Sequence, residues 1–280
     1  PEFLPLQDII ELRRKLRWSI SVGWIDSYCS HEELDRHLRT LVRSLFTPLA
    51  NSRESRFFSE KSPMNILVFS ELIDLLPEAH FIHVVRDPRA IISSMQDVKN
   101  RAKEKMITVP EYTRNIPSCI SFTSKCFASG FSALKKAPEK IHTVTYEALV
   151  AHPEEESRKI CDFLGLEWSE HMLSPHKKKH LGEKAITSNS GEIWYDLSSY
   201  YQEPHAQNIE KWKQRLTPVQ QVKVARAFQG NRDLKQFGYD ISCHHIPWTR
   251  RIPIQACLAL VDLVRRTGKL TLRLPPKAAG

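Results

Sequence analysis

The sequence predicts an α/β fold in which a parallel β-sheet is flanked by helices. Strand signals alternate with helix signals along much of the chain, which is the pattern of parallel α/β proteins. Residues 81–85 form an apolar run interrupted only by His83, as expected of a strand that is buried on both faces. With 280 residues and 41% hydrophobic content, the chain is long enough to bury a large core without disulfides or metal ions.

The local signals place the elements in order. Residues 6–16 have helical apolar spacing, and Ser30 with Glu33 forms a capping box that begins a second helix ending near Phe46. Strands are expected at 56–61, 81–85 and 141–146, and helices at 66–76, 88–105, 116–136 and from Pro153 to a cap at Gly165.

The remaining part of the chain contains a long polar segment and a basic end. Residues 177–207 are rich in His, Ser and Tyr and lack periodicity, which predicts a lid or substrate loop. Thr217 and Pro218 begin a helix that ends at Phe228. We expect one domain over residues 1–242 and a basic, partly amphipathic extension over 243–280.

The charge and the cysteines exclude several classes of partner. A formal charge of +9 indicates an anionic partner, but the basic residues are dispersed, so nucleic acid is not expected. No run approaches the roughly 18–20 apolar residues of a membrane span. The six cysteines form no CxxC pair and no zinc-finger spacing, so no metal site is expected. Cys119 and Cys126 are candidates for a disulfide in an oxidising compartment.

The segment 83–89, which reads His-Val-Val-Arg-Asp-Pro-Arg, joins a strand to a helix. Asp87 is a natural N-cap and Pro88 suits the first helical position, so the helix begins where the strand ends. Unpaired helix N–H groups and the Arg86 guanidinium predict a phosphate site, and Ser94 lies two turns on along the same face. The alternative is a structural Arg86 paired with a carboxylate, with Asp87 acting only as a cap.

This segment resembles the element that binds the 3′-phosphate in sulfotransferases dependent on 3′-phosphoadenosine-5′-phosphosulfate (PAPS), especially the tyrosylprotein and carbohydrate branch. The resemblance implies that Arg86 and Ser94 hold the 3′-phosphate of the nucleotide. It continues from about Glu2 to Asp240 through three further segments.

The first of these segments is 60–63, Glu-Lys-Ser-Pro. The resemblance implies that Lys61 contacts the transferring sulfuryl group or the bridging oxygen, with Ser62 as a weaker ligand. A fixed ammonium suits that position because charge develops on the leaving oxygen. The alternative is a solvated lysine.

The other two segments lie later in the chain. Residues 144–154 resemble the family element whose tyrosine contacts the nucleotide, which implies that role for Tyr146. The alternative is that the Tyr146 ring only packs against its neighbours in the strand. Residues 208–212, Asn-Ile-Glu-Lys-Trp, imply that Lys211 contacts the nucleotide phosphates.

One element of the family has no match in this sequence. Relatives bind the 5′-phosphosulfate with a Gly-rich loop after the first strand. We therefore expect the first strand and loop to lie upstream of Pro1, which leaves the fold N-terminally incomplete. Glu2 then corresponds to the family's catalytic glutamate, unless it is a carboxylate on a frayed end. An arginine of the tyrosylprotein branch has no match at Leu4 or Pro5, which puts a peptide tyrosine acceptor in doubt.

The resemblance implies a P-loop-kinase-like sulfotransferase fold with PAPS as co-substrate and no metal. The expected reaction transfers a sulfuryl group to a hydroxyl, or less readily an amine, of a small molecule, glycan or peptide. One alternative is a nucleotide kinase of related fold, but it would need a Walker loop, which is missing. Another is a non-catalytic anion- or nucleotide-binding protein. A third is that this chain, without the loop for the 5′-phosphosulfate, is an inactive form. The absence of Asn-x-Ser/Thr sites favours the cytoplasm over a Golgi lumen, which would require a lost N-terminal anchor.

Overall fold

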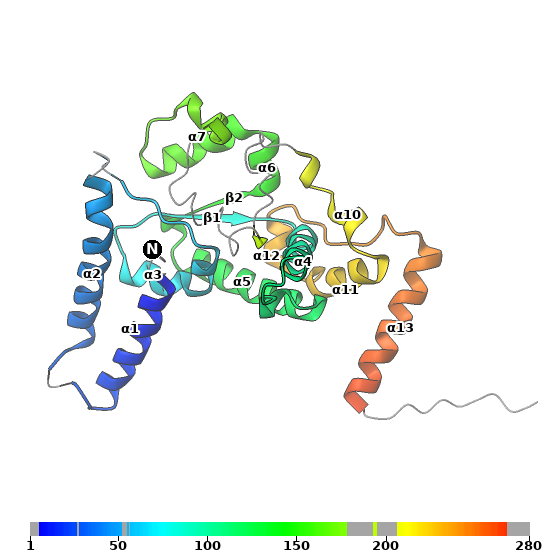
Figure 1. Cartoon of the computed structure of the whole chain (residues 1–280), viewed down its shortest axis with the longest axis horizontal. Coiled ribbons are helices and arrows are strands. Elements are labelled where there is room, and N and C mark those ends of the chain that lie inside the picture. The colour runs from blue at the N-terminus through cyan, green and yellow to red at the C-terminus, as the bar shows by residue number, and fades with distance from the viewer. Residues whose placement is uncertain are drawn as a thin grey trace, which may run out of the picture. The chain divides into compact units, whose positions relative to one another are not determined.

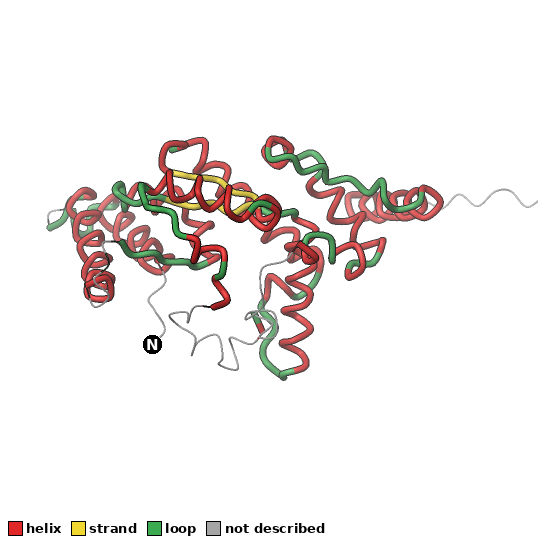
Figure 2. Tube along the Cα trace, turned by 90° about the horizontal axis from the view of Figure 1, so that it is seen from above, coloured by secondary structure: helices red, strands yellow, loops and turns green. Residues whose placement is uncertain are grey.

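The fold is described for residues 6–26, 28–51, 55, 57–177, 193–194 and 206–267 of a computed structural model. Contacts between Cα atoms divide the chain into unit 1, residues 1–85 and 121–178, and unit 2, residues 86–120 and 179–280. Figure 1 labels the main elements, and Figure 2 shows that helices predominate over strands. Among the described residues, the two strands form one sheet.

The elements of unit 1 follow the predicted alternation of helices and strands. They are α1 (Leu6–Ser21), α2 (His31–Asn51), η1 (Pro63–Val68), α3 (Phe69–Leu75), β1 (Phe81–Val85), most of α5 (Ile116–Lys136), η3 (Pro138–Lys140), β2 (Ile141–Thr145), α6 (Tyr146–Ala151), α7 (Pro153–Leu164), η4 (Glu170–Leu173) and η5 (Pro175–Lys177).

Unit 2 is helical in the part that the structure describes. Its elements are α4 (Pro88–Glu104), η2 (Glu111–Thr113), the beginning of α5, η7 (Ala206–Asn208), α10 (Trp212–Arg215), α11 (Pro218–Phe228), α12 (Arg232–Gln236) and α13 (Trp248–Thr267). In α11 the predicted start is confirmed, because Thr217 and Gln220 form a reciprocal capping box.

The two strands pair in parallel, with Phe81 opposite Ile141 and Val85 opposite Thr145. Residues of α3 and α5 form a buried cluster with Ile141 on one face of this sheet. On the other face the ring of Phe163, from α7, lies 5.5 Å from the ring of His142. The predicted parallel sheet with helices on both faces is therefore confirmed.

Two details of the predicted strands differ from the structure. Val84 in β1 is 54% exposed, so this strand is not buried on both faces along its whole length. Residues 57–62 form no strand. Phe58 instead stacks on Phe46 of α2 with ring centroids 4.2 Å apart, so aromatic packing on a helix replaces strand pairing.

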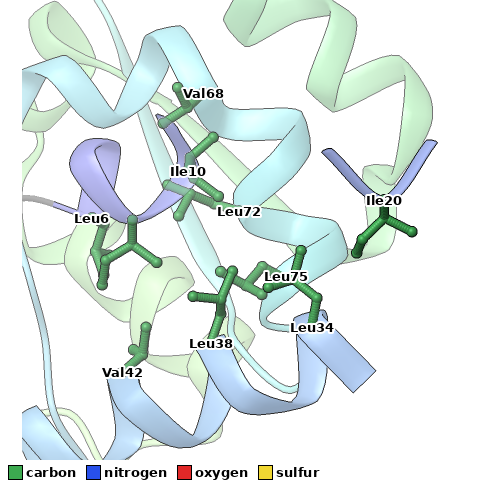
Figure 3. Close-up of a cluster of buried hydrophobic side chains, with 10 residues drawn as sticks. Leu6, Ile10, Ile20, Leu34, Leu38, Val42, Val68, Leu72 and Leu75 are labelled. Carbon is green, nitrogen blue, oxygen red and sulfur yellow. The ribbon is translucent and has the colours of Figure 1, made fainter. Parts of the chain in front are cut away.

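The N-terminal helices pack through a buried aliphatic cluster that is drawn in Figure 3. Its buried members are Leu6, Ile9, Ile10, Ile20, Leu34, Leu38, Val42, Val68, Leu72 and Leu75. At the start of α2 the backbone N–H and the hydroxyl of Ser30 donate to Glu33 Oε2 at 2.9 and 2.8 Å, and the Glu33 N–H donates back to the Ser30 hydroxyl. The predicted capping box is confirmed.

The cysteines are all free, so the candidate disulfide between Cys119 and Cys126 is wrong. The two residues lie seven positions apart in α5, about 10 Å along the helix axis, whereas a disulfide needs Cα atoms within about 7 Å. Burial also raises the pKa of Cys126 to about 11, which keeps this thiol protonated. Among the described helices, none is long and apolar enough to cross a membrane.

His83 lies in the interior of unit 1, where β1 closely approaches α5. Its ring centroid is 6.0 Å from that of Phe69 and 5.7 Å from that of Phe131. A Cβ added to Gly130 would lie 2.6 Å from His83 Nε2, so glycine permits this close approach of helix and strand. Burial lowers the pKa of His83 from 6.5 to about 4.

This buried histidine predicts a loss of stability in acid. The unfolded chain protonates His83 near pH 6.5, whereas the folded protein keeps the ring neutral down to about pH 4. Lowering the pH between these values therefore favours the unfolded state, by up to about 3 kcal/mol. Urea unfolding of His83→Gln across this range is expected to lose that part of the pH dependence. The exposed His152→Gln variant is the control, and parallel pH curves for wild type and His83→Gln would contradict the assignment.

Candidate nucleotide site

The predicted site residues fall in both units. Arg86, Ser94 and Lys211 belong to unit 2, and Lys61, Ser62 and Tyr146 belong to unit 1. Glu2 lies outside the described residues.

In unit 2 the start of α4 is held by Asp87 and Arg89. As predicted, Asp87 is the N-cap, and its Oδ1 accepts a hydrogen bond from the Arg89 backbone N–H at 2.8 Å. The Arg89 guanidinium also donates to this carboxylate, with Nη2 2.7 Å from Oδ2 and Nε 3.0 Å from Oδ1. Both side chains are buried, so this is a desolvated, bidentate ion pair.

Arg89 also connects α4 to the segment near residue 242, where the predicted domain ends. Its Nη1 donates to the Ser242 carbonyl at 2.9 Å and its Nη2 to the Asp240 carbonyl at 3.2 Å. The guanidinium stacks over the Trp212 ring, 4.2 Å from the centroid. These contacts give Arg89 a structural role that the sequence motif did not reveal.

The same contacts reduce the contribution expected from the helix N-terminus. Pro88 has no backbone N–H, and the Arg89 N–H is already bonded to Asp87. These two positions therefore offer no unpaired N–H group to a phosphate. An anion in this part of unit 2 depends mainly on side chains.

Arg86 is the half-buried arginine that precedes the cap. Its Nη2 donates to the Asn208 carbonyl at 3.4 Å, at the long end of the hydrogen-bond range. Lys211 lies three residues after Asn208, is half-buried, and is the N-cap residue of α10. The structure thus places the segment that carries Lys211 beside Arg86.

A second contact holds this segment on α4. Arg215, at the end of α10, forms an ion pair with Asp97 of α4. Ser94 is exposed on α4 and lies seven residues after Asp87, which places it on the face of the helix that carries the cap. Ser94 thus lies on α4, and Arg86 directly precedes its N-cap. The segment that carries Lys211 contacts both Arg86 and α4.

In unit 1 the segment 60–63 lies at the start of η1. Lys61 is exposed, and Ser62 is the N-cap of η1, although its side chain makes no capping hydrogen bond. Asn65 Nδ2 donates to the Glu60 carboxylate. Burial raises the pKa of Glu60, because desolvation disfavours the charged carboxylate.

Tyr146 follows the carboxyl end of β2 in the same unit. It is half-buried and is the first residue of α6, whereas the sequence predicted it as the last residue of the strand. The Thr145 hydroxyl accepts a hydrogen bond from the Ala148 N–H at 3.2 Å and so caps this helix. The switch from strand to helix fixes the backbone from which the Tyr146 ring projects.

Sequence reasoning missed the contact of Arg86 with the Asn208 carbonyl, the stacking of Arg89 on Trp212 and the structural role of Arg89. The one local signal was the Asp-Pro-Arg order, which places Arg89 on the first turn beside the cap. No group of three or more His, Cys, Asp or Glu side chains within the described ranges is arranged to hold a metal ion.

Comparison with known proteins connects these features to one family. The family model described as the sulfotransferase family matches residues 4–170. Protein-tyrosine sulfotransferase 1 of Danio rerio is 22% identical over 182 residues, which cover 65% of this chain and 48% of that protein. Protein-tyrosine sulfotransferase 2 of Gallus gallus is 27% identical over 56% of this chain and 40% of its own length.

Two further matches extend over more of the chain. The nodulation protein NoeE of Sinorhizobium fredii is 25% identical over 76% of this chain and 53% of its own length. The solved sulfotransferase domain from the curacin biosynthetic pathway has a TM-score of 0.51 at 17% identity, covering 82% of this chain and 79% of that domain. The latter likeness shows a shared fold. The chain spans about half the length of the relatives that it matches by sequence.

Proposed function

This chain belongs to the sulfotransferase family, and from that membership we propose that it transfers a sulfuryl group from PAPS to an acceptor hydroxyl, or less readily an amine. The observation that carries the proposal is the family match over residues 4–170, a range that contains Lys61, Arg86, Ser94 and Tyr146. We take residues 1–242 as the catalytic domain and 243–280 as an extension.

In unit 2 we assign the 3′-phosphate of the nucleotide to Arg86 and Ser94, with Lys211 as a further phosphate ligand. The bond from Arg86 to the Asn208 carbonyl and the ion pair between Arg215 and Asp97 support this assignment, because both hold the Lys211 segment on α4. The guanidinium, hydroxyl and ammonium groups together match the donors that a phosphate requires.

In unit 1 the family resemblance assigns the chemistry of transfer. Lys61 stabilises the oxygen that departs with the nucleotide, Ser62 is a weaker ligand and Tyr146 contacts the nucleotide. The acceptor oxygen attacks sulfur as the bond from sulfur to the bridging phosphate oxygen breaks, and Glu2 takes the acceptor proton. A positioned ammonium and a carboxylate base suffice for this step, which develops negative charge on the leaving oxygen.

The acceptor is proposed as a hydroxyl of a peptide, glycan or small molecule. Two relatives are named protein-tyrosine sulfotransferases, which makes a tyrosine peptide the first acceptor to assay. The tyrosylprotein branch has an arginine where this chain has Leu4 or Pro5, so glycan and small-molecule hydroxyls should be tested in parallel. The cytoplasmic location expected from the absence of Asn-x-Ser/Thr sites stays a prediction.

Replacing Arg86 by alanine is expected to weaken binding of 3′,5′-adenosine bisphosphate by about 1.5–3 kcal/mol, because a charged hydrogen-bonded contact to the phosphate is lost. Isothermal titration calorimetry measures this change. Binding of 5′-AMP, which lacks the 3′-phosphate, is expected to change little in the same variant. The preference for the bisphosphate over AMP should therefore fall in Arg86→Ala.

The matched control is Arg232→Ala, which removes the same charge from an exposed position of unit 2 on α12. It should keep the wild-type preference. If Arg86→Ala and wild type distinguish the two nucleotides equally, Arg86 does not bind the 3′-phosphate. If wild type binds neither nucleotide, the proposed co-substrate is wrong for this chain.

A further inference from the structure

Helix α13, labelled in Figure 1, presents an apolar stripe to the outside. The side chains of Trp248, Ile252, Leu260 and Leu263 are 67%, 54%, 50% and 55% exposed. With the exposed Ala256 and Ala259 they recur every three to four residues, so they lie along one side of the helix. We call these six residues the α13 stripe: Trp248, Ile252, Ala256, Ala259, Leu260 and Leu263.

A different side of α13 attaches the helix to unit 2. Asp262 Oδ2 forms an ion pair with Arg226 Nη2 of α11 at 3.0 Å, and Arg251 Nη1 donates to the Cys243 carbonyl at 3.3 Å. Ile254 and Leu258, which lie on this side between the two contacts, are less exposed than the stripe. Packing within the described part of unit 2 therefore does not account for the stripe, since another side of the helix serves that purpose.

The charges of α13 favour an anionic surface. The helix contains four arginines and one acidic residue, Asp262, which is engaged by Arg226. Arg250 and Arg251 stand near its beginning, and Arg265 and Arg266 stand near its end in the sequence. Residues 268–280 add Lys269, Arg273 and Lys277 and contain no Asp or Glu.

An apolar stripe with a tryptophan at one end and arginines at both ends is typical of helices that lie in a membrane interface. At 20 residues α13 is about 30 Å long, and it is not apolar enough to cross a bilayer. Acidic headgroups would pair with the exposed Arg250 while the stripe enters the acyl boundary.

A second copy of the chain fits the stripe less well. A second copy would bring together two helices that each contain four arginines and one acidic residue, Asp262, which is already engaged. Such a pairing places like charges together without compensation. We therefore propose that α13 binds the surface of an anionic membrane through the α13 stripe and holds the protein there.

The test is co-sedimentation of the full chain with vesicles of phosphatidylcholine alone and of phosphatidylcholine mixed with phosphatidylserine. We expect binding to the mixed vesicles that weakens as salt is raised. Leu260→Gln/Leu263→Gln is expected to lower the partition coefficient about tenfold, because two side chains no longer enter the apolar layer. Arg250→Gln should weaken binding to the mixed vesicles and leave binding to neutral vesicles unchanged.

The matched control is Leu41→Gln/Leu45→Gln, which makes the same changes at leucines of α2 that are 40% and 46% exposed. It should bind as wild type does, and circular dichroism verifies that each variant is folded. An equal loss in both double variants, or no binding by wild type, overturns the proposal. So does a concentration-dependent dimer that Leu260→Gln/Leu263→Gln abolishes without any vesicle binding, since the stripe would then join two copies.

Discussion

Replacing Arg89 by alanine is expected to lower the free energy of unfolding of unit 2 by about 3–5 kcal/mol, because it leaves a buried carboxylate without its partner. Asp87 and Arg89 are 7% and 9% exposed, so water cannot replace the lost hydrogen bonds. The variant also loses the bonds to the Ser242 and Asp240 carbonyls and the stacking on Trp212. Urea unfolding followed by circular dichroism measures the change.

Arg158→Ala is the control for this prediction because it removes similar contacts at the surface. Arg158 pairs with Glu154 at 2.8 Å and stacks over Trp168 at 3.8 Å, but the pair is half exposed. Its loss should cost up to about 1 kcal/mol. Similar small losses in both variants would show that the Arg89 contacts do not stabilise the fold. In Asp87→Asn/Arg89→Met the loss should be smaller than in Arg89→Ala, since no buried charge is left unpaired.

Replacing Lys61 by methionine is expected to reduce the rate of sulfuryl transfer about 100- to 1,000-fold, because the charge that we propose to stabilise the leaving oxygen is removed. The methionine keeps most of the length of the side chain. Since Lys61 is exposed, the fold should not change. Transfer of labelled sulfate from PAPS to a panel of hydroxyl acceptors measures the rate.

The control for Lys61 is Lys125→Met, at an exposed position of α5 in the same unit. It should transfer sulfate at the wild-type rate. Calorimetry should show that Lys61→Met binds 3′,5′-adenosine bisphosphate nearly as wild type does, because the product lacks the sulfuryl group. A loss of nucleotide affinity that accounts for the whole loss of rate would contradict a role in transfer.

Much of the secondary structure could be predicted because its signals are local. The strand at Phe81–Val85 and the helices at Ile116–Lys136 and Pro153–Leu164 begin and end at the predicted residues. At the end of α7, Gly165 adopts a φ of 64°, the left-handed conformation that glycine adopts without strain. Caps and turns depend on a few neighbouring residues, so the sequence displays them directly.

The expected strand at 56–61 failed because its outcome depends on a distant contact. Phe57 and Phe58 have high strand propensity, but no local signal says whether a partner strand or a helix will pack against them. In the structure Phe58 stacks on Phe46 of α2 rather than pairing in a sheet. The pairing of β1 with β2 was foreseen as a parallel sheet, but their register is a tertiary result.

By itself, the sequence determined the family pattern, the alternation of strands and helices, and the junction at which Asp87 and Pro88 begin a helix after β1. The family resemblance proposed Arg86 as a phosphate ligand, but the sequence assigned no role to Arg89, three positions later. Only the tertiary structure shows what Arg89 does. Carbonyls more than 150 residues later, at Asp240 and Ser242, bury Arg89 against Asp87, while Arg86 stays half-buried beside the Lys211 segment. Burial and long-range partners, which no local pattern records, thus make Arg89 a structural arginine.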